Sequence, residues 1–69
     1  MKAVAFKDNQ PVKTWFHAIK VSQDKKYNYF IITEKIYHHE LIQTIRYDNA
    51  DKIVVYDDGK VVKTYYGVS

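Results

Sequence analysis

The chain has 69 residues, a formal net charge of +3 and a sequence pI of about 9.1, and 16% of its residues are aromatic. It has no cysteine, which excludes disulfides and thiolate metal sites, and its two isolated glycines cannot form a glycine-rich phosphate loop. No apolar run approaches the roughly 18 residues of a membrane span, and we expect one cytoplasmic domain over residues 1–69, without a signal peptide or a membrane partner.

The first and last predicted elements are hairpins that resemble each other. Residues 3–16 align without a gap on residues 53–66, and five positions are identical. These are Val4/Val54, Asp8/Asp58, Val12/Val62, Lys13/Lys63 and Thr14/Thr64. Asp58-Gly59 between β-branched runs is a strong hairpin signal, and Asn9, which replaces Gly59, also tolerates a left-handed backbone. We therefore predict a hairpin at each end, and either duplication or convergence explains the likeness.

Two details of these hairpins follow from single residues. Pro11 has no N–H to donate to a ladder, so we expect it on an edge strand or at a bulge. Gly59 supplies the positive φ of the second turn. That turn has either two residues, or three residues with a bulge, and the sequence leaves both registers open.

Two further strands are predicted at 12–21 and 27–33, joined through residues 23–26. With Asp24-Lys25 as a tight turn, Ile19 faces Phe30. One face is then the candidate core, with Trp15, His17, Ile19, Val21, Phe30 and Ile32. The other face carries Phe16, Ala18, Lys20, Ser22, Tyr27, Tyr29 and Ile31.

The segment 34–47 has two interpretations. As a helix, Tyr37, Leu41 and Ile45 form a stripe at four-residue spacing, joined by Ile42. As a strand, Tyr37, Leu41, Ile45 and Tyr47 share one face. The strand is favoured, with its start either early in the segment or only near Leu41, and Asp48-Asn49-Ala50-Asp51 then forms a turn into the last hairpin.

The predicted fold class is therefore mainly β: a small antiparallel meander or barrel-like sheet of five to six strands with hairpins at both ends. The alternative is an α+β domain with one helix within 34–47. Residues that fit a pleated, half-buried surface dominate the sequence, which favours the first.

No catalytic site, metal site, cofactor or small-molecule ligand is predicted. His17, His38, His39 and Glu40 are the only set with metal-ligand chemistry, and adjacent histidines on a strand point to opposite faces. Asp48, Asp51, Asp57 and Asp58 all fall at predicted turns, where aspartate accepts hydrogen bonds from nearby backbone N–H groups. We therefore expect a protein that is not an enzyme.

The aromatic content carries the functional prediction. Tyr27 and Tyr29, beside Lys20, Lys25 and Lys26, form a solvent-facing stripe in the predicted register. Exposed tyrosines are typical of protein interfaces, so we expect an interaction module that binds a protein partner or self-associates through an aromatic sheet face or an edge strand. The alternative is non-specific binding of single-stranded nucleic acid, because aromatic side chains interleaved with lysines can stack bases.

Overall fold

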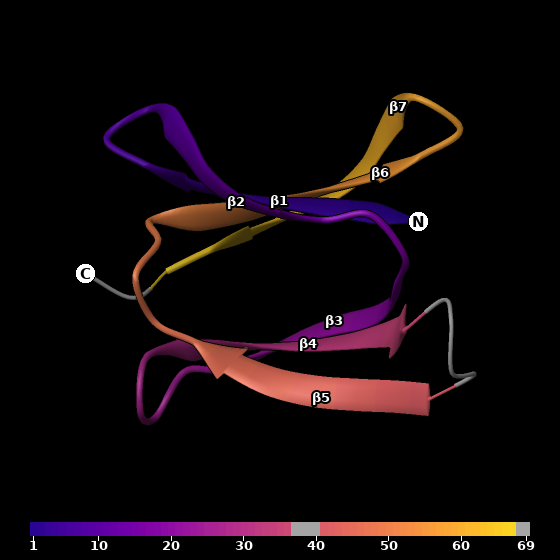
Figure 1. Cartoon of the computed structure of the whole chain (residues 1–69). Coiled ribbons are helices and arrows are strands. Elements are labelled where there is room, and N and C mark those ends of the chain that lie inside the picture. Colours follow the sequence, from indigo (N-terminus) through magenta and orange to yellow (C-terminus); the bar gives the residue numbers. More distant parts are fainter. Residues whose placement is uncertain (37–40, 68–69) are drawn as a thin grey trace.

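The computed structural model describes residues 1–36 and 41–67, and it contains two antiparallel sheets that face each other (Figure 1). The strands are β1 (Lys2–Lys7), β2 (Gln10–Trp15), β3 (Ala18–Asp24), β4 (Tyr29–Ile36), β5 (Leu41–Tyr47), β6 (Lys52–Asp57) and β7 (Lys60–Tyr66). One sheet has the order β2-β1-β6-β7 and the other the order β3-β4-β5. The mainly β class with hairpins at both ends is confirmed.

The described strands number seven because the segment predicted as one strand over 12–21 is divided. Trp15 ends β2, Phe16 and His17 form a turn, and Ala18 begins β3 in the opposite sheet. Two backbone hydrogen bonds hold this crossing: Ala18 N–H donates to the Met1 carbonyl (2.9 Å) and Lys35 N–H donates to the His17 carbonyl (3.0 Å).

The two end hairpins pair in the same register, and the second continues for one more pair, Lys52 with Tyr66. Ala5 pairs with Lys13 and Phe6 with Pro11, so that β2 bulges at Val12. The register of β6 with β7 shifts at the same place, which leaves Val62 as the bulged residue. Both turns therefore have two residues, and the second strand of each hairpin carries a bulge beyond the turn. Pro11 lies on an edge strand and beside a bulge, as predicted.

Left-handed backbone conformations close both turns. The φ angles are 53° at Asp8 and 63° at Asn9, and 54° at Asp58 and 76° at Gly59. Two consecutive residues with positive φ are typical of the type I′ turn, whose twist matches the twist of the flanking strands. Asparagine, aspartate and glycine are the residues that adopt this conformation at least cost.

A pseudo-twofold axis relates the hairpins. β1 pairs with β6 in an antiparallel ladder in which Val4 faces Val54, Ala3 faces Val55 and Ala5 faces Ile53. Val4 and Val54 are also equivalent in the sequence alignment, so the axis passes between them. In Figure 1 the two hairpin ends rise from the middle of this sheet on opposite sides, away from the other sheet.

The observed pairing of β3 with β4 differs from the predicted one by four residues: Phe30 faces Gln23 instead of Ile19. Val21 faces Ile32 and Gln23 faces Phe30, so residues 25–28 form the connection. Because side chains alternate with a period of two, a shift of four leaves the faces unchanged, and Val21, Phe30 and Ile32 are buried as predicted.

The prediction for Ala18 and Ile19 was wrong. A bulge between Ala18 and Lys20 inserts one residue, which reverses the faces at the start of β3. Ala18 is 3% exposed and belongs to the core, whereas Ile19 is 47% exposed. His17, also predicted for the core face, is exposed.

The core lies between the two sheets and is built around four fully buried side chains: Trp15, Phe30, Ile32 and Ile53. Ala3 and Ala5 leave room for these larger residues, and Ile45, Tyr47 and Tyr65 pack at the margin.

Within 34–47, the described part is strand and contains no helix. β5 begins at Leu41, one of the two starts that the sequence left open, and pairs with β4 from Ile36–Leu41 to Phe30–Tyr47 without a shift. The connection from β5 to β6 follows at 48–51, where the turn was predicted. Tyr37, His38, His39 and Glu40 lie outside the described residues.

Candidate interaction surfaces

Tyr27 and Tyr29 stack on each other at the β3–β4 connection. Their ring centroids are 6.3 Å apart and their planes differ by 13°. Tyr29 is the first residue of β4, on the face turned away from the core, while Tyr27 lies in the turn and is 66% exposed. The two predicted aromatic site residues are therefore brought together in one exposed group.

A cation lies over each ring of this pair. The Lys26 Nζ is 5.3 Å from the centroid of Tyr27, and the Arg46 Cζ is 5.3 Å from the centroid of Tyr29. Cation–π contacts at exposed sites contribute about 0.5–1 kcal/mol each. We call Lys26, Tyr27, Tyr29 and Arg46 the tyrosine stack. Arg46 was not among the predicted site residues, because only the pairing of β5 with β4 places it there.

Asp24 shapes the turn that presents the tyrosine stack. Its Oδ1 accepts hydrogen bonds from the backbone N–H groups of Lys26 (3.0 Å) and Tyr27 (3.3 Å), the local pattern by which aspartate replaces a backbone turn. Asn28 completes the turn with a φ of 56°. Partial desolvation, together with the hydrogen bond and negative charge of Asp24, raises the pKa of the Tyr29 phenol above its ordinary value of 10.0.

The other two predicted lysines lie elsewhere. Lys20 pairs with Thr33 on the outer surface of the three-stranded sheet, and Thr33 lies four residues along β4 from Tyr29. Lys25 lies in the turn and lines a groove between β3 and β7. The structure thus brings Lys26 together with Tyr27 and Tyr29, whereas Lys25 lines the groove and Lys20 lies farther along the three-stranded sheet.

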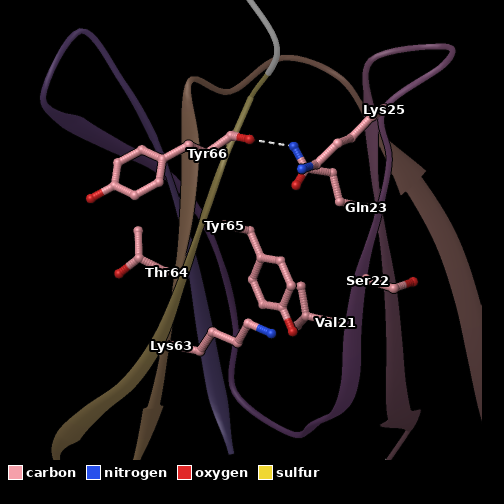
Figure 2. Close-up of a pocket in the computed structure, with 8 residues that line it drawn as sticks. All are labelled: Val21, Ser22, Gln23, Lys25, Lys63, Thr64, Tyr65 and Tyr66. Atoms are coloured by element: carbon pink, nitrogen blue, oxygen red, sulfur yellow. Dashed lines mark hydrogen bonds between the residues drawn. The ribbon is translucent and has the colours of Figure 1, made fainter.

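That groove has a volume of about 560 Å³ and lies between the free edges of the two sheets (Figure 2). β3 is the outer strand of one sheet and β7 the outer strand of the other. Its lining residues are Val21, Ser22, Gln23, Lys25, Lys63, Thr64, Tyr65 and Tyr66. Two of these carry a positive charge and none carries a negative charge.

The Gln23 side chain crosses the groove near one end. The Gln23 Nε2 donates a hydrogen bond to the Tyr66 carbonyl (Figure 2). Because a side chain bridges the two edges, they lie farther apart than the ~4.8 Å of hydrogen-bonded strands. The bond also shows that the Tyr66 carbonyl points toward β3, and main-chain groups alternate in direction along a strand. The N–H and C=O of Thr64 therefore point into the groove as well.

Of the four aspartates predicted at turns, Asp51 accepts a hydrogen bond from a nearby backbone N–H. The Asp51 Oδ2 accepts a hydrogen bond from the Asp8 N–H (2.8 Å), and the Asp51 N–H donates to the Phe6 carbonyl (2.8 Å). Within residues 1–36 and 41–67, no three histidine, aspartate or glutamate side chains gather as a metal site would require. Of the four residues considered from the sequence as metal ligands, His17 is described, and His38, His39 and Glu40 lie in the interval between the two ranges.

Over the described residues, there is no helix of the length and apolar character that a membrane crossing demands. Comparison with known proteins found no matching family model, no similar curated protein and no similar solved structure.

Proposed function

We propose that this chain is a non-enzymatic, cytoplasmic interaction module that binds an extended segment of a partner protein in the groove between β3 and β7. The observation that carries the proposal is that two unpaired strand edges border one cavity of about 560 Å³. Addition of a strand to a free edge is a common mode of peptide recognition, in which main-chain hydrogen bonds supply affinity.

The direction of the bound segment follows from the strands. Figure 2 shows β3 rising from Val21 to Lys25 and β7 rising beside it from Lys63 to Tyr66. A segment that runs the opposite way is antiparallel to both edges, which is the more stable pairing per residue. On entry it replaces the Gln23 amide at the Tyr66 carbonyl, so the contact now closing the groove is exchanged for a main-chain bond.

The charges define the chemistry of the partner. Lys25 and Lys63 flank the groove and no acidic side chain is among its described lining residues. An acidic segment therefore gains charge-assisted contacts and associates faster at low salt. The Tyr65 ring lies on the groove side of β7 (Figure 2) and supplies the large, rigid aromatic surface on which interface affinity concentrates.

Selection from a displayed library of random seven-residue peptides tests this proposal. We expect enriched sequences to be acidic and to alternate apolar with polar residues, because a strand presents alternate side chains to one face. Lys63→Glu should weaken the selected peptides about ten-fold or more. The matched control is Lys13→Glu, the equivalent position of the other hairpin, which should leave binding unchanged. A selection without binders, or equal losses in both variants, contradicts the proposal.

Main-chain recognition has its own test. Thr64→Pro removes an N–H that points into the groove and leaves the ladder with β6 intact, so binding should be lost. Thr14→Pro, at the equivalent position of β2, should fold as well and bind normally. If both variants bind equally, the segment does not pair with β7.

The tyrosine stack supports a second candidate function, non-specific binding of single-stranded nucleic acid. The specific observation is the pair of stacked rings with a cation over each, since base stacking on aromatic side chains contributes about 1–3 kcal/mol per base. Fluorescence anisotropy with a labelled oligonucleotide should then show an affinity that falls steeply with salt and that Tyr27→Ala reduces. No binding at low salt removes this candidate.

A further inference from the structure

The four outer strands of the two sheets differ in how their edges are protected. Natural sheets prevent unwanted edge pairing with proline, bulges and charged side chains, especially lysine. β2 carries Pro11 and the bulge at Val12. β7 carries the bulge at Val62 and two lysines. β3 carries the bulge at Ile19, and its Gln23 side chain reaches across to β7.

β5 has none of these features. Its seven residues pair with β4 without a shift, it contains no proline or lysine, and Arg46 is its only charged residue. Leu41 is 57% exposed and Ile42 is 67% exposed, on opposite faces of the strand. A long, regular and apolar edge that is left open is a template for another strand.

We propose that β5 pairs antiparallel with β5 of a second copy of this chain, about a twofold axis at Thr44. Thr44 is the middle residue of β5, so an axis at this position is the one that pairs all seven residues. The dimer then contains a continuous six-stranded sheet. The interface is isologous, the commonest arrangement of soluble homo-oligomers.

The side chains fit this register on both faces. On the core side, Leu41 faces Tyr47 of the second copy, and Tyr47 packs against the core, so the exposed leucine extends the hydrophobic interior. On the outer side, Ile42 faces Arg46 of the second copy. The charges are compatible, since the single cation of each strand meets an aliphatic side chain and no like charges face each other.

The dimer does not use the peptide groove, because β5 and β3 are opposite edges of the same sheet. A variant can therefore lose self-association and keep peptide binding, or lose peptide binding and keep self-association. Light scattering coupled to size exclusion, on the full chain at about 0.1 mM, gives the first measurement. We expect twice the monomer mass of 8.2 kDa. A monomer at this concentration overturns the proposal.

Two substitutions at Ile42 test the register with opposite expected signs. Ile42→Lys places two lysine–arginine contacts across the axis and should weaken the dimer. Ile42→Glu places two glutamate–arginine contacts there and should strengthen it, so that the two dissociation constants differ about ten-fold or more. The difference should shrink in ~1 M salt, where the Debye length is about 3 Å.

Matched controls separate these effects from damage to the fold. Val12→Lys and Val12→Glu make the same charge changes on β2, another outer strand, and should not change the dimer mass. Thr44→Lys and Thr44→Glu each place like charges on the axis, so an equimolar mixture should form a heterodimer tighter than either variant alone. Equal effects at Ile42 and Val12, or no preference in the mixture, contradict pairing through β5.

Discussion

Trp15 and Tyr47 meet edge to face across the interior, with ring centroids 5.2 Å apart and planes at 84°. Trp15 ends β2 in the four-stranded sheet and Tyr47 ends β5 in the three-stranded sheet, so this contact joins the two layers. Such aromatic pairs contribute about 0.5–1.5 kcal/mol beyond the area they bury. The Trp15 Nε1 is buried without a hydrogen-bond partner among the described residues.

Trp15→Ala should therefore lower the free energy of unfolding by about 3–5 kcal/mol, the usual cost of deleting a buried aromatic side chain. Trp15→Phe should lower the free energy of unfolding much less. Phenylalanine keeps an aromatic ring in the core, and it has no N–H to bury without a partner. Urea unfolding followed by far-ultraviolet circular dichroism measures both. Phe16→Ala, one residue further and 68% exposed, is the control, and a change of more than about 0.5 kcal/mol there would contradict the assignment of the core.

The two end turns should respond to substitution in opposite directions. Gly59 has a φ of 76° and no atom within 4 Å of an added Cβ, so Gly59→Ala should cost about 1–2 kcal/mol from backbone conformation alone. Asn9→Gly should stabilise the first turn by a few tenths of a kcal/mol. Thermal unfolding of both variants decides the matter. A stabilised Gly59→Ala variant is incompatible with the left-handed turn.

Asp51 should be more important for stability than its exposure indicates. It accepts a hydrogen bond from Asp8 N–H, donates to the Phe6 carbonyl, and its own carbonyl accepts from Gly67 N–H (2.7 Å). Asp51→Ala removes the first of these and should cost about 1 kcal/mol. Asp48→Ala makes the same charge change in the same loop and should be nearly neutral in urea unfolding. Equal effects would show that the Asp8 contact does not stabilise the fold.

Tyr29 should make the fold sensitive to alkali. Desolvation and Asp24 raise the pKa of its phenol in the folded state, so the folded state holds this proton more tightly than the unfolded chain does. The stabilisation is fully present below the unfolded value of about 10 and is lost as pH rises through the folded pKa. Unfolding free energies measured from about pH 9 to 11 should therefore fall less in Tyr29→Phe than in the wild type.

Asp24→Asn provides the check on the cause of this shift. It keeps the Oδ1 acceptor of the turn and removes the negative charge. The pKa of Tyr29 should move back toward its ordinary value, measured as the difference in phenolate absorbance between this variant and its Tyr29→Phe double. No movement would exclude Asp24 as a contributor.

The features that the sequence predicted well are local ones. Asp58-Gly59 and its counterpart Asp8-Asn9 marked both hairpins, because few residue types tolerate positive φ. Tyr27 and Tyr29 are two residues apart at the β3–β4 connection, so their grouping could be predicted without any distant contact. The faces of β3 and β4 survived a wrong register, since the displacement was even.

The features that it did not predict depend on contacts far apart in the chain. Phe16 and His17 turn the chain from one sheet to the other without glycine or proline, so no local signal marked the crossing. The bulge at Ile19 is set by packing of Ala18 in the core. Arg46 joins the tyrosine stack and Lys63 joins Lys25 only through the arrangement of β5 and β7.

The pseudo-twofold pairing of β1 with β6 also has a consequence for how the chain folds. Each end hairpin closes over two turn residues and can form alone in about 1–10 μs. Val4 and Val54, by contrast, must find each other across fifty positions of chain, and such distant pairing is intrinsically slow because the loop entropy is lost before the contact is gained. We therefore expect the sheet to assemble from its two end hairpins, with their pairing at these valines as the slow step.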